Sequence, residues 1–302
     1  MRRSNDTIEL EATTWFDGPA LEFDLPGVEV GLAEYDEGPT GCTVLKFPDG
    51  ASAATDIRGG AVGVTGAEYD WLHGVCFAGG SVFGLEAAFG VGTGRLADAD
   101  YEIGWGTIPF VAGAIIWDWH GRDNAIYPDA ALGRAAYHAA HPGRFPLGKR
   151  GAGRSAGVGQ GAAYRDAAGV KVAVFTVVNA LGSVVDRDGS VLTGSRRPVI
   201  DEIDERIAKH EAAAPPRDGN TTLTLVATNR KMSHGSLTQL ARTVHSSMAR
   251  AIQPFHTESD GDVLFAVTTN EVDHEPPAVW ETAVIASELA WDAVLSAVPS
   301  RG

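Results

Sequence analysis

The sequence predicts a layered domain of the α/β or α+β class. Runs rich in β-branched residues recur along the chain, and helical stretches lie between some of them while others follow one another directly. No repeat of fixed period stands out, so a layered arrangement is favoured. The chain has 302 residues, of which 44% are hydrophobic and 21% charged, so it can bury a large core as one large domain or two ordinary ones.

The expected strands are short and mostly rich in β-branched residues. They cover residues 28–35, 42–47, 111–119, 170–179, 222–228 and 263–269. The expected helices are marked by small apolar residues, by acidic residues at a start, or by apolar side chains at helical spacing. They cover residues 79–92, 129–140, 201–214, 236–252 and 279–298.

The helix over residues 236–252 has the clearest pattern. Ser236 and Gln239 form a capping-box pattern, and apolar residues recur at helical spacing behind them. The helix over residues 279–298 is apolar around most of its circumference, which predicts a position between two layers.

Residues 212–220 are expected to form a linker. Two prolines prevent the preceding helix from continuing, and the turn-forming residues after them expose the segment to proteolysis. The chain therefore changes from a helix to a β-rich run across a segment that is open to cleavage.

The composition excludes several classes of partner. The net charge of −15 argues against nucleic acid and anionic membrane surfaces, which need clustered Lys and Arg. No segment reaches the roughly 18 apolar residues of a membrane span, and no apolar stretch follows the charged first residues, so we expect a cytoplasmic protein. Cys42 and Cys76 are too few for a disulfide scaffold, and the histidines form no zinc-type grouping, so we expect no metal and no cofactor.

The Gly-rich segment at residues 151–161 matches no nucleotide-binding or nucleophile motif in its context. Gly153 to Gly157 spell G-x-S-x-G, but a nucleophile elbow needs a strand before it and a helix after it. The closing G-K-[ST] of a P-loop is absent, and so is the dinucleotide pattern. We interpret the segment as a loop, or as a place where the backbone approaches a ligand.

Asp260 and Asp262 surround one glycine just before an expected strand. A tight turn in which aspartates cap backbone amides is the common explanation of such a pair, and it is not an EF-hand because the closing glutamate is absent. The functional alternative is that the carboxylates orient a hydroxyl or hold an ammonium. For His245, on the helix over 236–252, and His256, in a loop, a structural role is favoured.

Thr221 has the best physical case as a nucleophile. A threonine hydroxyl is weak at neutral pH, and the α-amino group of the same residue can activate it once the chain is cut before it. That amine has an ordinary pKa near 7.7–8.0, so it can act as a base around neutrality. From spacing alone, an ordinary turn before a strand explains Gly-Asn-Thr equally well.

Five segments resemble those of a known family, and the likeness runs from about residue 24 to about residue 297. They read "GPTGCTVLKFPDGASAATDIRGGAVGVTG", "CFAGGSVFGLEAAFGVG", "IYPDAALGRAA", "GNTTLTLVATN" and "VHSSMARAIQPFHTESDGDVLFAVTTNEVD". The chain resembles the nylon-oligomer (6-aminohexanoate-oligomer) endo-hydrolases, within the self-processing L-/D-/β-aminopeptidase family of N-terminal-nucleophile type.

The resemblance implies a four-layer α/β/β/α sandwich and a single domain over residues 1–302 that cuts itself. Cleavage would fall between Asn220 and Thr221, and the fragments 1–220 and 221–302 would stay associated. Thr221 would then be the nucleophile of the smaller fragment. A homo-oligomer, in the form of a tetramer, is also implied.

The resemblance assigns roles to three further residues. Asn179 matches the asparagine that stabilises the oxyanion, which fits the need for a hydrogen-bond donor where charge develops. Asp260 and Asp262 match the pair that positions the threonine and supports self-cleavage.

Two positions depart from the family pattern. The family has a lysine in the Gly-rich segment ahead of the asparagine strand, whereas here the nearest lysine is Lys149, outside that segment. Trp117 stands where the family has a tyrosine, and it keeps a donor N–H but lacks the acidic phenol. Lys149 and Trp117 are therefore candidates for substrate or oxyanion contacts.

The resemblance predicts a hydrolase that uses an N-terminal threonine to cleave 6-aminohexanoate (nylon) oligomers or related linear amides. One alternative is an aminopeptidase or β-peptidyl aminopeptidase acting on small peptides, because loops around the pocket decide which amides are cut. Another is a non-catalytic descendant that serves as a binding or assembly scaffold, which the missing lysine and Trp117 favour.

Overall fold

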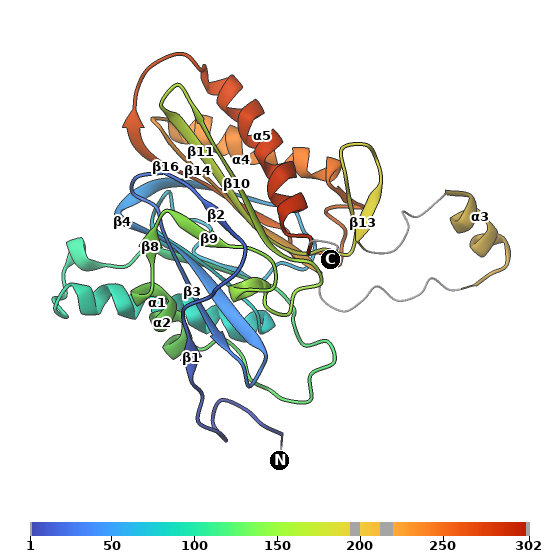
Figure 1. Cartoon of the computed structure of the whole chain (residues 1–302), viewed down its shortest axis with the longest axis horizontal. Coiled ribbons are helices and arrows are strands. Elements are labelled where there is room, and N and C mark those ends of the chain that lie inside the picture. Colours follow the sequence, from blue (N-terminus) through green and yellow to red (C-terminus); the bar gives the residue numbers. More distant parts are fainter. Residues whose placement is uncertain (1, 194–199, 212–219, 300–302) are drawn as a thin grey trace.

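The computed structural model describes residues 2–193, 200–211 and 220–299 (Figure 1). The expected linker at 212–220 lies outside them except for Asn220. The helices are α1 (Glu86–Asp98), α2 (Ala130–His138), α3 (Ile200–Ala208), α4 (His234–Ser247) and α5 (Val279–Ser296). Short 3₁₀ helices are η1 (Ser81–Leu85), η2 (Trp105–Thr107), η3 (Gly151–Gly153) and η4 (Met248–Arg250).

The strands form two facing layers that share β4 (Thr40–Ile57). One layer has the order β10 (Gly159–Ala167), β11 (Val170–Asn179), β14 (Thr221–Arg230), β16 (Val263–Val272) and the second half of β4. The other contains β3 (Glu29–Tyr35), the first half of β4, β6 (Trp71–Ala78), β7 (Val111–Ile115) and β5 (Val64–Thr65). The short strands are β1 (Ala12–Thr13), β2 (Ala20–Glu22), β8 (His141–Pro142), β9 (Arg144–Pro146), β12 (Ser183–Val185), β13 (Val191–Thr193) and β15 (Ile252–Gln253).

A change of register lets β4 pass from one layer to the other. Its first half pairs with β3, and its second half pairs antiparallel with β16. The register against β6 shifts between Lys46 and Ala51, and Gly50 in this stretch has a φ of 77°, which favours glycine. The strand therefore bends at this point, as strands do at bulges.

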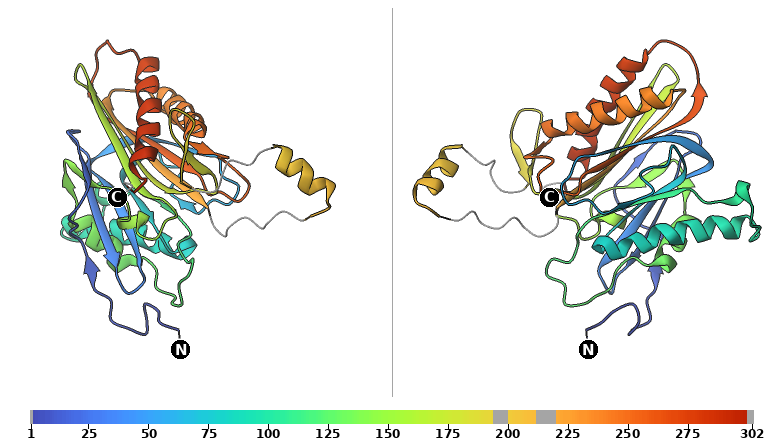
Figure 2. Two further views of the ribbon diagram at one scale, coloured as in Figure 1. Left: turned by 45° about the vertical axis from the view of Figure 1, so that its right-hand side comes forward. Right: turned by 180° about the vertical axis from the view of Figure 1, so that it is seen from behind.

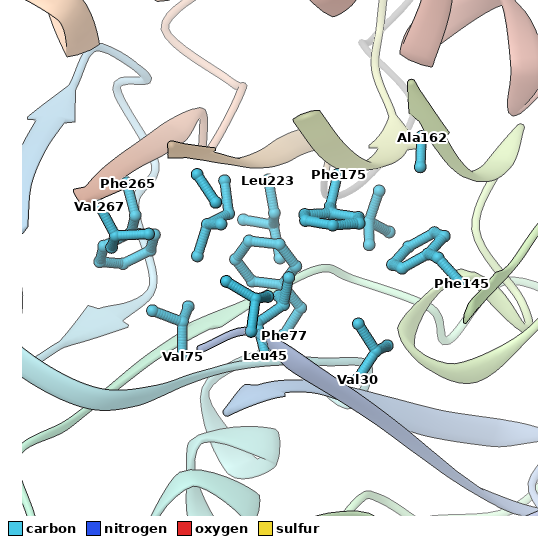
Figure 3. Close-up of a cluster of buried hydrophobic side chains, with 14 of the residues drawn as sticks. Val30, Leu45, Val75, Phe77, Phe145, Ala162, Phe175, Leu223, Phe265 and Val267 are labelled. Carbon is cyan, nitrogen blue, oxygen red and sulfur yellow. The ribbon is translucent and has the colours of Figure 1, made fainter. Parts of the chain in front are cut away.

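The main core lies between the two strand layers (Figure 3). Alternate side chains of each strand point into it, because neighbouring strand residues face opposite sides. In β11, Phe175 points into this core and packs against Phe23 and Phe145, with ring centroids 5.3 and 5.0 Å apart. Leu223 of β14 and Phe265 of β16 point the same way.

Helices cover the outer face of each layer (Figures 1 and 2). The pair α4 and α5 packs on the layer that contains β10, β11 and β16, around a second apolar cluster. The pair α1 and α2 packs on the layer that contains β3 and β6, around a third. The predicted four-layer α/β/β/α sandwich is thereby confirmed.

Three local predictions differ from the structure. α5 lies in an outer layer rather than between layers, since α4 and the sheet cover much of its apolar surface while Trp280 and Val284 stay 69% and 52% exposed. α4 begins at His234, where the side chain of Ser233 accepts the N–H of Ser236, so the cap lies earlier than expected. The strand expected over 111–119 ends at residue 115.

Some strands were not expected at all. β10 has many glycines and alanines, so its β propensity is weak, and its pairing with β11 stabilises it. β6 carries residues that favour strands, such as Trp71, Val75 and Phe77, and pairs with β4. Cys42 and Cys76 are both buried free thiols. No helix in the described residues is both long enough and apolar enough to cross a bilayer.

Candidate active site

The predicted site residues meet at one end of the β11, β14 and β16 ladder. β14 and β16 run parallel, so they begin at the same end of the sheet, and the antiparallel β11 finishes there. Thr221 opens β14 and faces Asn179, the last residue of β11. An isolated bridge pairs Asn220 with Asp260 just before β16. The fold therefore brings together segments that lie far apart in the sequence.

The hydroxyl of Thr221 lies against the preceding peptide group. Thr221 is buried, and its Oγ1 donates a hydrogen bond to the carbonyl oxygen of Asn220 at 2.5 Å. The backbone N–H of Gly261 donates to the same oxygen at 2.8 Å. Two donors thus polarise the Asn220 carbonyl, and a hydroxyl that could attack it stands beside it.

Gly261 packs directly against the hydroxyl of Thr221. A Cβ at this position would lie 2.7 Å from Thr221 Oγ1 and 2.9 Å from the carbonyl oxygen of Ala61. Both distances are shorter than ordinary van der Waals contact, so a side chain here would displace the hydroxyl or the backbone. The absence of a side chain is what permits the close approach.

Asp262 holds the backbone on both sides of the threonine site. It is fully buried, and its Oδ1 accepts the backbone N–H of Thr222 at 2.7 Å. Its Oδ2 accepts the backbone N–H of His256 at 3.1 Å and hydrogen bonds to Nδ1 of the same residue at 3.0 Å. The carboxylate is therefore fully engaged, as a buried charge must be.

Asp260 fastens two loops beside the same site. Its Oδ2 accepts the N–H and the hydroxyl of Thr257 at 3.1 and 2.6 Å, and its Oδ1 accepts the N–H of Leu181 at 3.3 Å. Burial raises the pKa of Asp260, the nearby charge of Asp262 raises it further, and the Thr257 hydroxyl opposes both effects. In the described part of the chain, neither Asp260 nor Asp262 bonds the hydroxyl of Thr221 itself, so both act on the surrounding backbone.

Asn179 connects the site to two other segments. Its side-chain Nδ2 donates to the carbonyl oxygen of Trp117 at 3.0 Å, and its Oδ1 accepts the N–H of Gly157 at 2.7 Å. Trp117 thus reaches the site residue through its main chain, whereas the sequence prediction considered its indole. These bonds fix the amide plane of Asn179 next to Thr221.

Lys149 lies on the other side of the Gly157 loop. Its Nζ donates to the carbonyl oxygen of Ala156 and to that of Gly157, the latter at 3.2 Å. Burial lowers the pKa of Lys149. Among the described residues Lys149 pairs with no carboxylate. Its ammonium instead donates to carbonyl groups of the loop whose Gly157 N–H binds Asn179.

The sequence prediction gave no role to Gly157 or Gly261 and only a structural one to His256. Each contacts a predicted site residue through a main-chain or ring N–H. Gly261 is flanked by two aspartates, but its contact with the Asn220 carbonyl depends on strand register, which spacing does not encode. No group of three metal-ligating side chains occurs in the described residues.

Solved structures with the same architecture support the fold assignment. The L-aminopeptidase D-Ala-esterase/amidase of Ochrobactrum anthropi, described as a variant of the Ntn hydrolase fold, superposes with a TM-score of 0.67. The match covers 94% of this chain and 88% of that one at 16% identity, so it defines the fold class alone. The sandwich is accordingly of N-terminal-nucleophile hydrolase type.

The chain belongs to Peptidase family S58, whose profile matches residues 23–300. It is similar to the 6-aminohexanoate-oligomer endohydrolase of Paenarthrobacter ureafaciens, with 44% identity over 323 residues that cover 97% of this chain and 90% of the relative. The endohydrolase of the same name from Kocuria sp. (strain KY2) is 45% identical over 307 residues, covering 92% and 85%. The predicted resemblance is confirmed, and the chain is a hydrolase that acts on amide bonds.

Proposed function

We propose that the chain cuts itself between Asn220 and Thr221 and then uses the freed Thr221 to hydrolyse linear amides such as 6-aminohexanoate oligomers. The contact that carries this proposal joins three groups: the Thr221 hydroxyl, the Asn220 carbonyl, and the Gly261 N–H on the same carbonyl oxygen. A nucleophile, an electrophile and an oxyanion donor are thereby preassembled around one peptide bond.

Self-cleavage begins when Thr221 Oγ1 attacks the carbonyl carbon of Asn220. Negative charge develops on the carbonyl oxygen, which the Gly261 N–H stabilises. The C–N bond then breaks, the proton from the hydroxyl passes to the leaving nitrogen, and an ester links Asn220 to Oγ1. Water hydrolyses this ester, which releases the Asn220 carboxylate and leaves Thr221 with a free hydroxyl and a free amine.

The fragments 1–220 and 221–302 stay together in this proposal and form one domain. β14 begins at the cut and lies between β11 and β16, with every residue of the strand buried. Separating the fragments would expose that strand and its core-facing side chains to water. Hydrophobic burial on this scale holds a cut chain together without the covalent link.

In the mature enzyme the α-amine of Thr221 accepts the proton of its own hydroxyl as Oγ1 attacks the substrate carbonyl. The amide of Asn179 lies next to the nucleophile and stabilises the oxyanion, while Asp262 and Asp260 hold the surrounding backbone. The amine product leaves, and water then cleaves the threonine ester. Lys149 and Trp117 support Asn179 by holding its amide and the Gly157 loop.

The substrate proposal rests on relatives that are named 6-aminohexanoate-oligomer endohydrolases and match nearly the whole chain. A test is incubation of the purified protein with 6-aminohexanoate oligomers whose amino ends are free or acetylated, followed by mass spectrometry of products. We expect cleavage of both. Cleavage of free-amine oligomers alone would favour an aminopeptidase, and an uncut chain that acts on neither would favour a scaffold.

We also propose that the protein assembles as a homo-tetramer of cut protomers. Large apolar side chains on η1, α1, the following loop and η2 support association, because they are mostly exposed in the single chain: Phe83, Phe89, Ile103 and Trp105 are 62%, 65%, 93% and 90% exposed. Light scattering after gel filtration measures the assembly. A cytoplasmic location is likewise a proposal, which fractionation of producing cells would test.

A further inference from the structure

A pair of histidines lies beside Asp262. His256, in the loop before β16, hydrogen bonds through Nδ1 to Asp262 at 3.0 Å. His245, on α4, hydrogen bonds through Nδ1 to Asp56 of β4 at 2.8 Å. The two rings meet edge to face, with centroids 4.4 Å apart and an angle of 84° between their planes. Polar side chains, of which His245 and Asp262 are buried, thus form a continuous row from β4 to the threonine site.

Each ring is anchored through one nitrogen only. A carboxylate oxygen accepts, so each Nδ1 carries a proton and donates. The Nε2 atoms of both rings are buried and have no hydrogen-bond partner among the described residues. The orientation of the His256 ring therefore depends on its bond to Asp262 and on packing against the rings of His245 and Phe255, whose centroids lie 4.4 and 3.8 Å away.

His256 also has an unusual backbone conformation. Its φ is 61°, in the left-handed region that costs free energy for a residue with a Cβ. This conformation directs both the backbone N–H and the ring Nδ1 at the same oxygen, Oδ2 of Asp262. Oδ1 of Asp262 is then turned toward the N–H of Thr222. The strained backbone of His256 thus occurs together with a single orientation of the Asp262 carboxylate, in which Oδ2 faces His256 and Oδ1 faces Thr222.

The position of His245 explains why the pair is stable. His245 is 1% exposed, and its carboxylate partner Asp56 also pairs with Arg58 at 2.6 Å. Burial lowers the pKa of His245, which keeps the ring neutral and its Nδ1–H available to Asp56. The ring of His245 is therefore held in place and packs against the ring of His256.

We propose that His256 is a positioning residue for both reactions of Thr221. It acts through Asp262, whose Oδ1 holds Thr222 and so fixes the start of β14, where the scissile peptide and the nucleophile lie. Without the ring donor of His256, only the backbone N–H of residue 256 still holds Oδ2, so the carboxylate can rotate and Thr221 shifts relative to the Asn220 carbonyl and the Gly261 N–H. This inference rests on the proposed self-cleaving function.

The test compares three substitutions of His256. In His256→Asn the side-chain Nδ2 takes the place of the ring Nδ1, and asparagine tolerates positive φ. His256→Asp has the same shape and the same backbone tolerance but no donor when ionised. His256→Ala removes the donor without adding charge, so it remains informative if the Asp variant fails to fold.

Both reactions are measured for each variant. The first measurement is the rate of precursor cleavage after cell-free synthesis, and the second is kcat and KM of the cut enzyme on a 6-aminohexanoate oligomer. We expect His256→Ala and His256→Asp to slow cleavage and lower kcat by about 10- to 100-fold, with little change in KM. We expect the cleavage rate and kcat of His256→Asn to stay within about 3-fold of the wild-type values, because the side-chain N–H of asparagine still holds Asp262 and so keeps Thr221 in place.

The inference fails if folded His256→Ala cleaves itself and turns over at wild-type rates, or if folded His256→Asn is as slow as His256→Ala. Circular dichroism establishes folding for each variant. A wild-type chain that neither cuts itself nor hydrolyses amides would instead refute the proposed function, so the two failures are distinguishable.

Discussion

Replacement of Gly261 by alanine tests the geometry of the Asn220–Thr221 peptide, at which we propose that the chain cuts itself. A Cβ at this position would lie 2.7 Å from Thr221 Oγ1 and 2.9 Å from the carbonyl oxygen of Ala61. Ordinary contact begins at 3.4 Å, so relieving both contacts requires the Thr221 hydroxyl to move by about 0.7 Å and the Ala61 carbonyl by about 0.5 Å, or the Gly261 backbone to shift. The hydroxyl is the group least able to move without loss, because it must reach the Asn220 carbonyl.

The expected effect follows from that displacement. A shift of about 1 Å in a reacting group can cost about 100-fold in rate, so a shift of this size predicts a slowing of self-cleavage by about 10- to 100-fold. The added methyl group should also lower the free energy of unfolding by about 1–3 kcal/mol, as overpacked sites do. The fold itself should be retained, since a loss of this size is smaller than the roughly 5–15 kcal/mol by which domains are usually stable.

Cell-free synthesis followed by a timed denaturing gel measures the loss of the full-length band. The matched control is Gly235→Ala in α4, where the nearest atom to an added Cβ, Ser233 Oγ, is 4.0 Å away. We expect the control to cut at the wild-type rate and to be as stable or slightly more so. Equal cleavage rates for Gly261→Ala and wild type would refute the assigned role of the Gly261 contact.

Four further outcomes follow. Thr221→Ala should give one uncut, inactive chain on gels and in product assays, and amide hydrolysis by that variant would exclude Thr221 as nucleophile. Asn179→Ala should lower kcat by about 100- to 1,000-fold in steady-state kinetics, whereas a change in KM alone would contradict an oxyanion role. Phe175→Ala removes a fully buried ring between the layers, so the free energy of unfolding from denaturant titration should fall by about 3–5 kcal/mol. A fall of less than about 1 kcal/mol would be inconsistent with that packing. Burial lowers the pKa of His73 from 6.5 to about 4, and its Nδ1 accepts the N–H of Phe110. As the pH falls, the imidazole of residue 73 is protonated in the unfolded chain before it is protonated in the folded one. The free energy of unfolding therefore falls as the pH drops from 6.5 to 4. Without screening this loss would be about 3 kcal/mol, and we expect about 1–2 kcal/mol because solvent screens the partly exposed ring. In His73→Gln the free energy of unfolding should depend less on pH over this range, as measured by denaturant titration at several pH values. An unchanged pH dependence would contradict the lowered pKa of His73.

The layered fold could be predicted because its strands and helices carry strong local patterns. β11 and β14 are rich in Val and Thr and alternate between the two apolar cores, and their bounds nearly match the expected ones. β10 could not be predicted, since its glycines and alanines favour no structure until neighbouring strands supply hydrogen bonds. Propensity identifies strands that have strong side-chain preferences, and pairing decides the others.

The site could be predicted in part for a related reason. The chemistry of Thr221 and the paired aspartates is readable from residue type and spacing once a resemblance supplies the context. The contacts of Gly261 and His256 depend on the parallel register of β14 and β16 and on a backbone angle, neither of which residue order specifies. Sequence therefore proposed the side chains of the candidate site, and the structure brings them together and adds the main-chain donors around them.

The most direct test of the central claim is intact mass analysis of the purified, active protein, combined with N-terminal sequencing of its smaller fragment. The account predicts two chains, the smaller beginning at Thr221, which remain together on native gel filtration. A preparation that hydrolyses amides while every molecule retains the unbroken Asn220–Thr221 bond would contradict it.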